Sequence, residues 1–127
     1  MKSPESLEEW FPTETIERVR ELLDKRFTSN PVELEDHLKD MATVQGNIAE
    51  LFSEAQSLVA YSRQAAMLDK RARALTAAER KYWIDGQCRR ETQVRDLLEG
   101  FGKALKDKII LGEVLSKGIN GEVVHRQ

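Results

Sequence analysis

The chain has 127 residues, of which 33% are charged and 40% hydrophobic, and its net charge is −2. These values are typical of a folded, soluble domain and exclude an intrinsically disordered chain. No apolar run is long enough to cross a membrane, and the acidic start lacks the apolar core of a signal peptide. The single cysteine, Cys88, excludes an internal disulfide and a zinc site built from several cysteines. We therefore expect a cytoplasmic protein with no membrane partner.

The charges are unevenly distributed along the chain. Residues 1–54 contain 13 acidic and 6 basic residues, whereas residues 55–90 contain 3 acidic and 8 basic residues. Residues 91–127 contain 6 of each. The small net charge therefore hides a basic block in the middle of the chain.

Two short helices are expected at the N-terminus. Ser3 as a cap and Pro4 at the first helical position, followed by glutamates, predict the first helix, and Pro12 ends it. Thr13 or Thr15 is expected to cap a second helix that runs to about residue 27. Its apolar residues recur with helical spacing: Ile16, Val19, Leu22, Leu23 and Phe27.

A long helix is expected to begin at Asn30, a good N-cap, with Pro31 at its first position. A heptad pattern follows without a slip: Leu34, Leu38, Met41, Gln45, Ile48, Phe52, Ala55, Val59, Ser62 and Ala66. A second row recurs every seven residues beside it: Val44, Leu51, Leu58, Ala65 and Ala72. A stripe of this width can pack against more than one partner helix.

The Thr76 and Glu79 pair has the spacing of a capping box, which predicts a turn near Leu75 and the start of another long helix. Its apolar row is Ile84, Cys88 or Gln87, Glu91, Val94, Leu98, Phe101, Leu105 and Ile109, with Leu97, Ala104, Leu111 and Leu115 alongside. Gly118 offers a stop after Lys117. The alternative is one continuous helix from residue 31 to residue 117, since neither Gly nor Pro interrupts residues 69–83.

The predicted fold is therefore all-α, with short N-terminal helices followed by a long, coiled-coil-like antiparallel helical hairpin. Residues 1–118 are expected to form a single helical domain and residues 119–127 a flexible C-terminal tail. Because the outer apolar rows need cover, we also expect self-association through helices.

Few residues suggest catalytic chemistry. His37 and His125 lie far apart in the sequence, without acidic residues at metal-ligand spacing, and are expected on the surface. Arg89 and Arg90 beside Cys88 could lower its pKa, but Cys88 falls on the apolar stripe, which favours a core thiol over a nucleophile. The prediction is a non-enzyme without a cofactor or metal.

The basic block is the one candidate site. A turn near Thr76 would gather its cations at one tip, with Arg63 level with Arg89. Arg80 and Lys81 near a helix start are electrostatically unfavourable there, which suggests a function. Two aromatic rings follow directly and could stack on bases. The predicted nucleic-acid-binding residues are Lys70, Arg71, Arg73, Arg80, Lys81, Tyr82, Trp83, Arg89 and Arg90. The alternative is a solvated hairpin end, with Tyr82 or Trp83 in the core.

Two segments resemble a known family. Residues 97–115, LLEGFGKALKDKIILGEVL, look like the C-terminal assembly helix of phage recombination mediators of the UvsY type, and residues 69–75, DKRARAL, look like their basic DNA-contact segment. The resemblance implies an oligomer that binds single-stranded DNA and helps load a recombinase onto strands coated by a single-strand-binding protein. It implies that Lys70, Arg71 and Arg73 are the DNA contacts.

The predicted function is that of an accessory protein in DNA recombination or replication that binds single-stranded DNA. The alternative is a structural or adaptor protein that binds another protein through its long amphipathic helices. The wide apolar stripe and the acidic N-terminal half favour this alternative.

Overall fold

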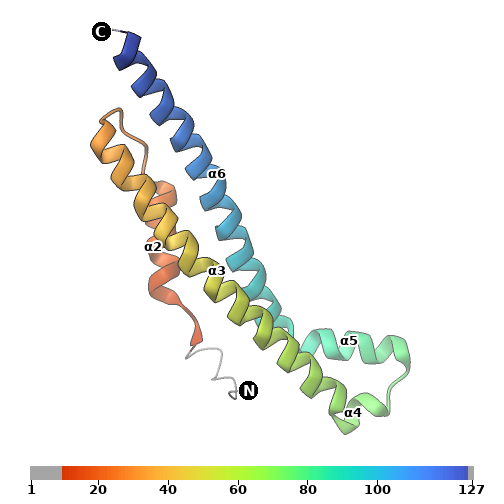
Figure 1. Ribbon diagram of the computed structural model, residues 1–127. Helices are drawn as coiled ribbons and strands as arrows, with labels where there is room; N and C mark the ends of the chain where they lie inside the picture. Colours follow the sequence, from red (N-terminus) through yellow and green to blue (C-terminus); the bar gives the residue numbers. More distant parts are fainter. Residues whose placement is uncertain (1–9, 126–127) are drawn as a thin grey trace. The chain divides into compact units, whose positions relative to one another are not determined.

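The computed structural model describes residues 10–125, and all its secondary structure in that range is helical (Figure 1). The predicted helix that begins at Ser3 lies outside the described residues. The described helices are α2 (Thr13–Asp24), α3 (Pro31–Leu68), α4 (Lys70–Arg73), α5 (Ala77–Gln87) and α6 (Arg89–His125). The all-α prediction is confirmed. Within this range no helix combines the length and apolarity that a membrane span requires.

The contacts separate the chain into two compact units. Unit 1 comprises Met1–Phe11 and Glu50–Glu99, and unit 2 comprises Pro12–Ala49 and Gly100–Gln127. The long helices α3 and α6 each contribute one part to each unit. The single domain over residues 1–118 and the flexible tail stay predictions.

The start of α3 matches the sequence, whereas the start of α2 does not. The Asn30 side-chain oxygen accepts hydrogen bonds from the backbone N–H groups of Val32 and Glu33, at 3.0 and 3.2 Å, so the predicted N-cap is confirmed. In α2 the N-cap is Pro12, whose carbonyl accepts from the Ile16 amide at 3.0 Å. The predicted cap at Thr13 or Thr15 is therefore wrong. A carbonyl can accept the first helical bond without any side-chain cap.

The helices also end at places that the apolar pattern does not mark. The α2 helix ends at Asp24, because Lys25 is extended, so residue 27 lies outside the helix. The α6 helix continues past Gly118 to His125, and the described glycines have no positive φ. The predicted helix stop at Gly118 is wrong, because Gly permits a left-handed cap without requiring one.

The continuous-helix alternative is wrong, because α3 ends at Leu68 and α5 begins only at Ala77. The predicted break near Leu75 is present, and two breaks that were not predicted accompany it. The Asp69 carboxylate accepts from the Arg71 amide at 2.9 Å and starts the short helix α4. Cys88, with φ −104° and ψ 9°, separates α5 from α6.

Each unit has a buried apolar core. In unit 2 its residues are Ile16, Val19, Leu22, Leu34, Met41, Val44, Ile48 and Leu105. In unit 1 they are Ala55, Val59, Ala66, Ala72, Ile84, Cys88, Val94 and Leu98. Every residue of the predicted heptad row is buried or half-buried, which confirms that row. The second row fails at Ala65, which is exposed.

Two glycines of α6 lie against α3 within unit 2. A Cβ added to Gly102 would lie 3.6 Å from Ile48 Cγ2, an ordinary contact. A Cβ added to Gly112 would lie 2.5 Å from Leu38 Cδ2 and 2.8 Å from Phe27 Cζ. At residue 112 the neighbouring side chains therefore occupy the space that any larger residue would need.

Candidate functional site

All nine predicted nucleic-acid-binding residues belong to unit 1, where they lie on α4, on α5 and at the start of α6. Eight of them are exposed, and Trp83 alone among the nine is half-buried. The structure thus brings the predicted residues into one compact unit, but it gives them different roles.

Thr76 positions the start of α5. Its hydroxyl oxygen accepts from the Glu79 amide at 3.3 Å, which confirms the predicted N-cap. The hydroxyl also donates to the Glu79 carboxylate at 2.7 Å. The capping box is therefore completed by a bond between the two side chains. It determines where α5 begins, just before the basic and aromatic residues of that helix.

Arg71 is engaged by its own helix start. Its guanidinium donates to both carboxylate oxygens of Asp69, at 3.2 and 3.1 Å, and lies 5.5 Å from the centre of the Trp83 ring. These hydrogen bonds hold the pKa of Asp69 below its ordinary value and raise the pKa of Arg71. The charge of Arg71 is therefore already matched within unit 1.

Arg80 caps the end of α4. Its Nε donates to the carbonyl oxygen of Ala72 at 2.9 Å, and its Nη2 donates to that of Leu75 at 3.3 Å. Carbonyls at a helix end lack partners within the helix and need such donors. The position of Arg80 near a helix start therefore has a structural reason, and it no longer indicates a ligand.

Three cations of the predicted set behave differently. Lys70, Arg73 and Lys81 are exposed, and their side chains have no hydrogen bond or ion pair within the described part of the chain. Because Arg80 of α5 bonds the end of α4, the two short helices that carry these cations lie together. We call these exposed residues of the two helices, together with Tyr82, the α4–α5 surface; it is defined by Lys70, Arg73, Lys81 and Tyr82.

The two aromatic residues have opposite environments. Tyr82 is 81% exposed, whereas Trp83 packs on a buried cluster of Ala66, Ile84 and Cys88. Trp83 thus follows the core interpretation, and Tyr82 is the ring that can reach a ligand. Burial also raises the pKa of the Cys88 thiol, whose residue is 0% exposed. The core-thiol interpretation of Cys88 is confirmed.

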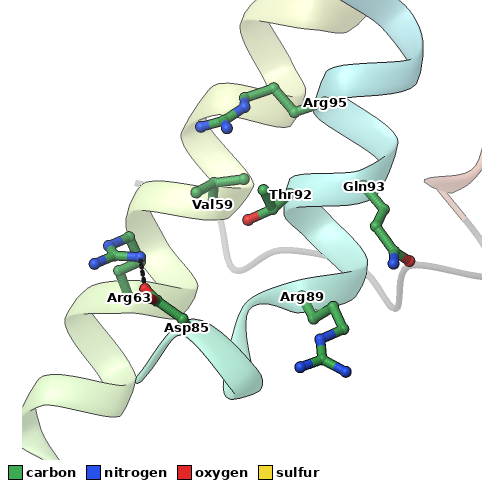
Figure 2. Close-up of a pocket in the computed structure, with 7 residues that line it drawn as sticks. All are labelled: Val59, Arg63, Asp85, Arg89, Thr92, Gln93 and Arg95. Carbon is green, nitrogen blue, oxygen red and sulfur yellow. Dashed lines mark hydrogen bonds and ion pairs between the residues drawn. The ribbon is translucent and has the colours of Figure 1, made fainter. Parts of the chain in front are cut away.

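A cavity of about 370 Å³ lies in unit 1 between α3, α5 and α6 (Figure 2). The residues that line it are Val59, Arg63, Asp85, Arg89, Thr92, Gln93 and Arg95. Arg63 donates to the Asp85 carboxylate at 2.8 Å. Figure 2 shows Val59 and Thr92 facing each other, with the Arg89 side chain directed away from the Arg63–Asp85 pair.

Sequence reasoning placed Arg63 level with Arg89, and both indeed line this cavity. It missed Thr92, Gln93 and Arg95. A signal was available for Thr92 alone, which follows Arg89 by three residues on α6, since Asp85 belongs to α5 across the break at Cys88.

His37 was expected on the surface, and this prediction is wrong. His37 is only 4% exposed, its Nε2 lies 3.1 Å from the Leu22 carbonyl oxygen, and its ring centre lies 5.0 Å from that of Phe27. The histidine satisfies a carbonyl near the end of α2. A single sequence shows no such contact, because the two residues are 15 positions apart and belong to different helices.

No protein-family model, curated protein or solved structure matches the chain. The resemblance to recombination mediators of the UvsY type stays a prediction.

Proposed function

We propose that the protein is a non-enzymatic accessory protein of DNA metabolism that binds single-stranded DNA through the α4–α5 surface. The observation that carries the proposal is the group of three exposed cations without a protein partner in the described chain, beside a ring that is 81% exposed. Cations hold phosphates, and an exposed ring can stack on a base that is not paired.

Single-stranded DNA fits this surface better than a duplex. Base stacking on an aromatic side chain contributes about 1–3 kcal/mol per base, and it needs a base that is accessible. Tyr82 supplies such a ring.

In a cell, such a protein would assist the loading of a recombinase, with a single-strand-binding protein as a further partner. This part of the proposal rests on the resemblance of residues 69–75 and 97–115 to the UvsY type. It predicts activity without any catalytic residue.

The test is fluorescence anisotropy with a short, labelled single-stranded oligonucleotide at low salt. The test variant changes the three cations of the α4–α5 surface to Ala: Lys70, Arg73 and Lys81. A matched control removes three exposed cations of unit 2: Arg26, Lys106 and Lys117. We expect the test variant to bind at least about tenfold more weakly and the control to bind like the wild type. If both variants bind equally weakly, the effect comes from net charge alone and the proposed surface is refuted. If the wild-type protein does not bind the oligonucleotide, the proposed function is refuted.

We further propose that α3 and α6 form an antiparallel hairpin. Two pairs in unit 2 support it, because Gly102 lies against Ile48 and Gly112 against Leu38, and the residue numbers of each pair add to 150. In two antiparallel helices the residue number rises along one helix as it falls along the other, so facing residues have a constant sum. The Arg63–Asp85 ion pair within unit 1 is compatible with the same direction.

A second candidate function, protein binding, is favoured by an exposed apolar face of α6 in unit 2. The face consists of Ile110, Leu111, Val114 and Leu115, which are 49%, 55%, 61% and 41% exposed. We propose that a second copy of the chain covers this face. Its margins carry Asp107 and Lys117, so an antiparallel pairing of two copies would bring opposite charges together.

A further inference from the structure

We propose that the cavity of unit 1 is a subsite for one phosphate group of a nucleic acid strand. The inference rests on the proposed single-stranded DNA binding and adds to it a defined position for one nucleotide. It uses residues outside the predicted set, above all Thr92, Gln93 and Arg95.

The charges of the cavity favour an anion. Three arginines and one carboxylate line it, and the carboxylate of Asp85 is bonded by Arg63 at 2.8 Å. Arg95 donates to Asp96 at 3.1 Å, and that carboxylate is not part of the lining. Arg89 has no hydrogen bond or ion pair among the described residues. A planar guanidinium without a partner matches the bidentate geometry of a phosphate.

The lining also contains neutral hydrogen-bonding groups. Thr92 contributes a hydroxyl and Gln93 an amide, and Figure 2 shows the Gln93 and Arg89 side chains directed away from Val59. The α6 helix begins at Arg89, so its N-terminal amides add a partial positive charge beside the cavity. Sites for small ligands measure about 300–1,000 Å³. A cavity of about 370 Å³ therefore suits a ligand as small as a single nucleotide.

The cations of the cavity and those of the α4–α5 surface suit a strand that contacts both. Both sites belong to unit 1, and Arg89 and Lys81 are separated by less than the length of α5 in sequence. The cavity would hold one phosphate, and the exposed cations would contact its neighbours along the strand. Two contacts of this kind on one strand act together, which raises the affinity above that of either alone.

The first measurement is a titration of the full-length protein with thymidine monophosphate, followed by backbone amide NMR signals. We expect the signals of Arg89, Thr92 and Gln93 to shift, and the shifts to disappear in the double variant R89Q/T92V. The variant R26Q/T28V makes the same chemical changes on exposed residues of unit 2 and should respond like the wild type. Helical circular dichroism that matches the wild type verifies the fold of both variants. An absence of shifts at millimolar nucleotide would overturn the proposal.

Inorganic phosphate and thymidine serve as the two other probes. Weaker shifts at the same signals with phosphate, and none with thymidine, would support a phosphate site. Equal shifts with thymidine and with the monophosphate would overturn the assignment of an anion site.

The oligonucleotide assay then separates this proposal from the proposed function. We expect R89Q/T92V to weaken binding of the labelled strand about tenfold, which is the size of one lost charged hydrogen bond. If R89Q/T92V binds like the wild type while the Lys70, Arg73 and Lys81 variant does not, the subsite is refuted and the function stands. If the monophosphate shifts the cavity signals but no strand binds, the cavity is a mononucleotide site outside any strand-binding surface, and the proposed function is refuted.

Discussion

The Phe27 ring makes Gly112 sensitive to substitution. The ring lies 5.0 Å from the His37 ring, between centres, and 5.2 Å from the Lys108 ammonium. Lys108 also donates to the carbonyl oxygen of Leu23 at 2.6 Å, and burial lowers the pKa of its ammonium group. A ring held between these groups cannot easily move away from a new methyl group.

We therefore expect Gly112→Ala to lower the free energy of unfolding by about 1–3 kcal/mol through overpacking. The control is Gly100→Ala in the same helix, where an added Cβ meets nothing within 4 Å. There the better helix propensity of Ala should raise the stability by about 0.5–1 kcal/mol. Urea denaturation of both variants measures the difference, and two shifts of the same sign would contradict the close approach at residue 112.

The buried thiol of Cys88 predicts a response to high pH. Its pKa is raised in the fold above the ordinary 9.0, so the unfolded chain loses this proton at a lower pH than the folded chain does. The contribution of the protonated Cys88 thiol to the free energy of unfolding is complete below pH 9 and is lost as the pH rises through the folded pKa. We expect the urea midpoint of the wild type to fall more between pH 8.5 and about 10.5 than that of Cys88→Ala, which has no thiol.

A thiol reagent gives a second measurement on the same residue. At pH 8 we expect native Cys88 to react at least about 100-fold more slowly than the urea-unfolded chain, since reaction requires opening of the fold. Equal rates would show that the thiol is accessible in the folded protein.

At the scale of the element, local sequence predicted the helix starts that depend on a side chain and its own neighbours. Asn30 and Thr76 both act as N-caps, because a cap bonds amides only two or three residues away. The sequence did not predict the breaks at Asp69 and Cys88. Asp69 is itself an N-cap that bonds the Arg71 amide two residues away, so a local signal was present there, whereas no side-chain cap marks the break at Cys88.

The same limit explains the candidate site. Composition identified the basic block, since charge can be counted along the chain. It could not identify Arg71 and Arg80 as structural, because their partners are Asp69 and backbone carbonyls that become accessible only when α3 ends early. The buried His37 was missed for a related reason, since its partner is a carbonyl of another helix.

The cap of α5 gives a prediction with a matched control. We expect Thr76→Ala to lower the free energy of unfolding by about 1 kcal/mol, because the Glu79 amide loses its acceptor, and Thr76→Ser to retain most of the stability. Thr13→Ala at the start of α2 should have almost no effect, since Pro12 is the N-cap there. Urea midpoints of the three variants provide the measurement. A larger loss at Thr13 than at Thr76 would contradict these assignments.

At the scale of the whole molecule, the uneven charge and the exposed face of α6 both bear on assembly. Acidic residues are in excess in residues 1–54 and basic residues in residues 55–90, so the proposed self-association would bring regions of opposite charge together. The apolar face of α6 would supply the contact area that such attraction lacks. Assembly would also place several α4–α5 surfaces along one strand.

We expect light scattering after size exclusion to give a mass above that of the monomer for the wild type. Leu111→Glu should reduce the mass to that of the monomer, because it places a charge in the middle of the proposed interface. The control is Leu68→Glu, which changes an equally apolar residue that is 63% exposed at the end of α3. A wild-type monomer, or an unchanged mass for Leu111→Glu, would contradict self-association through α6.

The internal bonds of Arg71 and Arg80 have a consequence for the ions around a bound strand. Each phosphate that a protein cation neutralises releases condensed counterions, so the affinity falls as the salt concentration rises. In a plot of log affinity against log salt concentration, each contact with a single strand contributes about −0.7 to the slope. If all seven predicted cations touched phosphates, the slope would be about −5. If Arg71 and Arg80 stay engaged within the protein and the other five touch phosphates, it would be about −3.5. The slope of a salt titration therefore gives the number of cations that contact phosphates, and the difference from seven gives the number engaged within the protein.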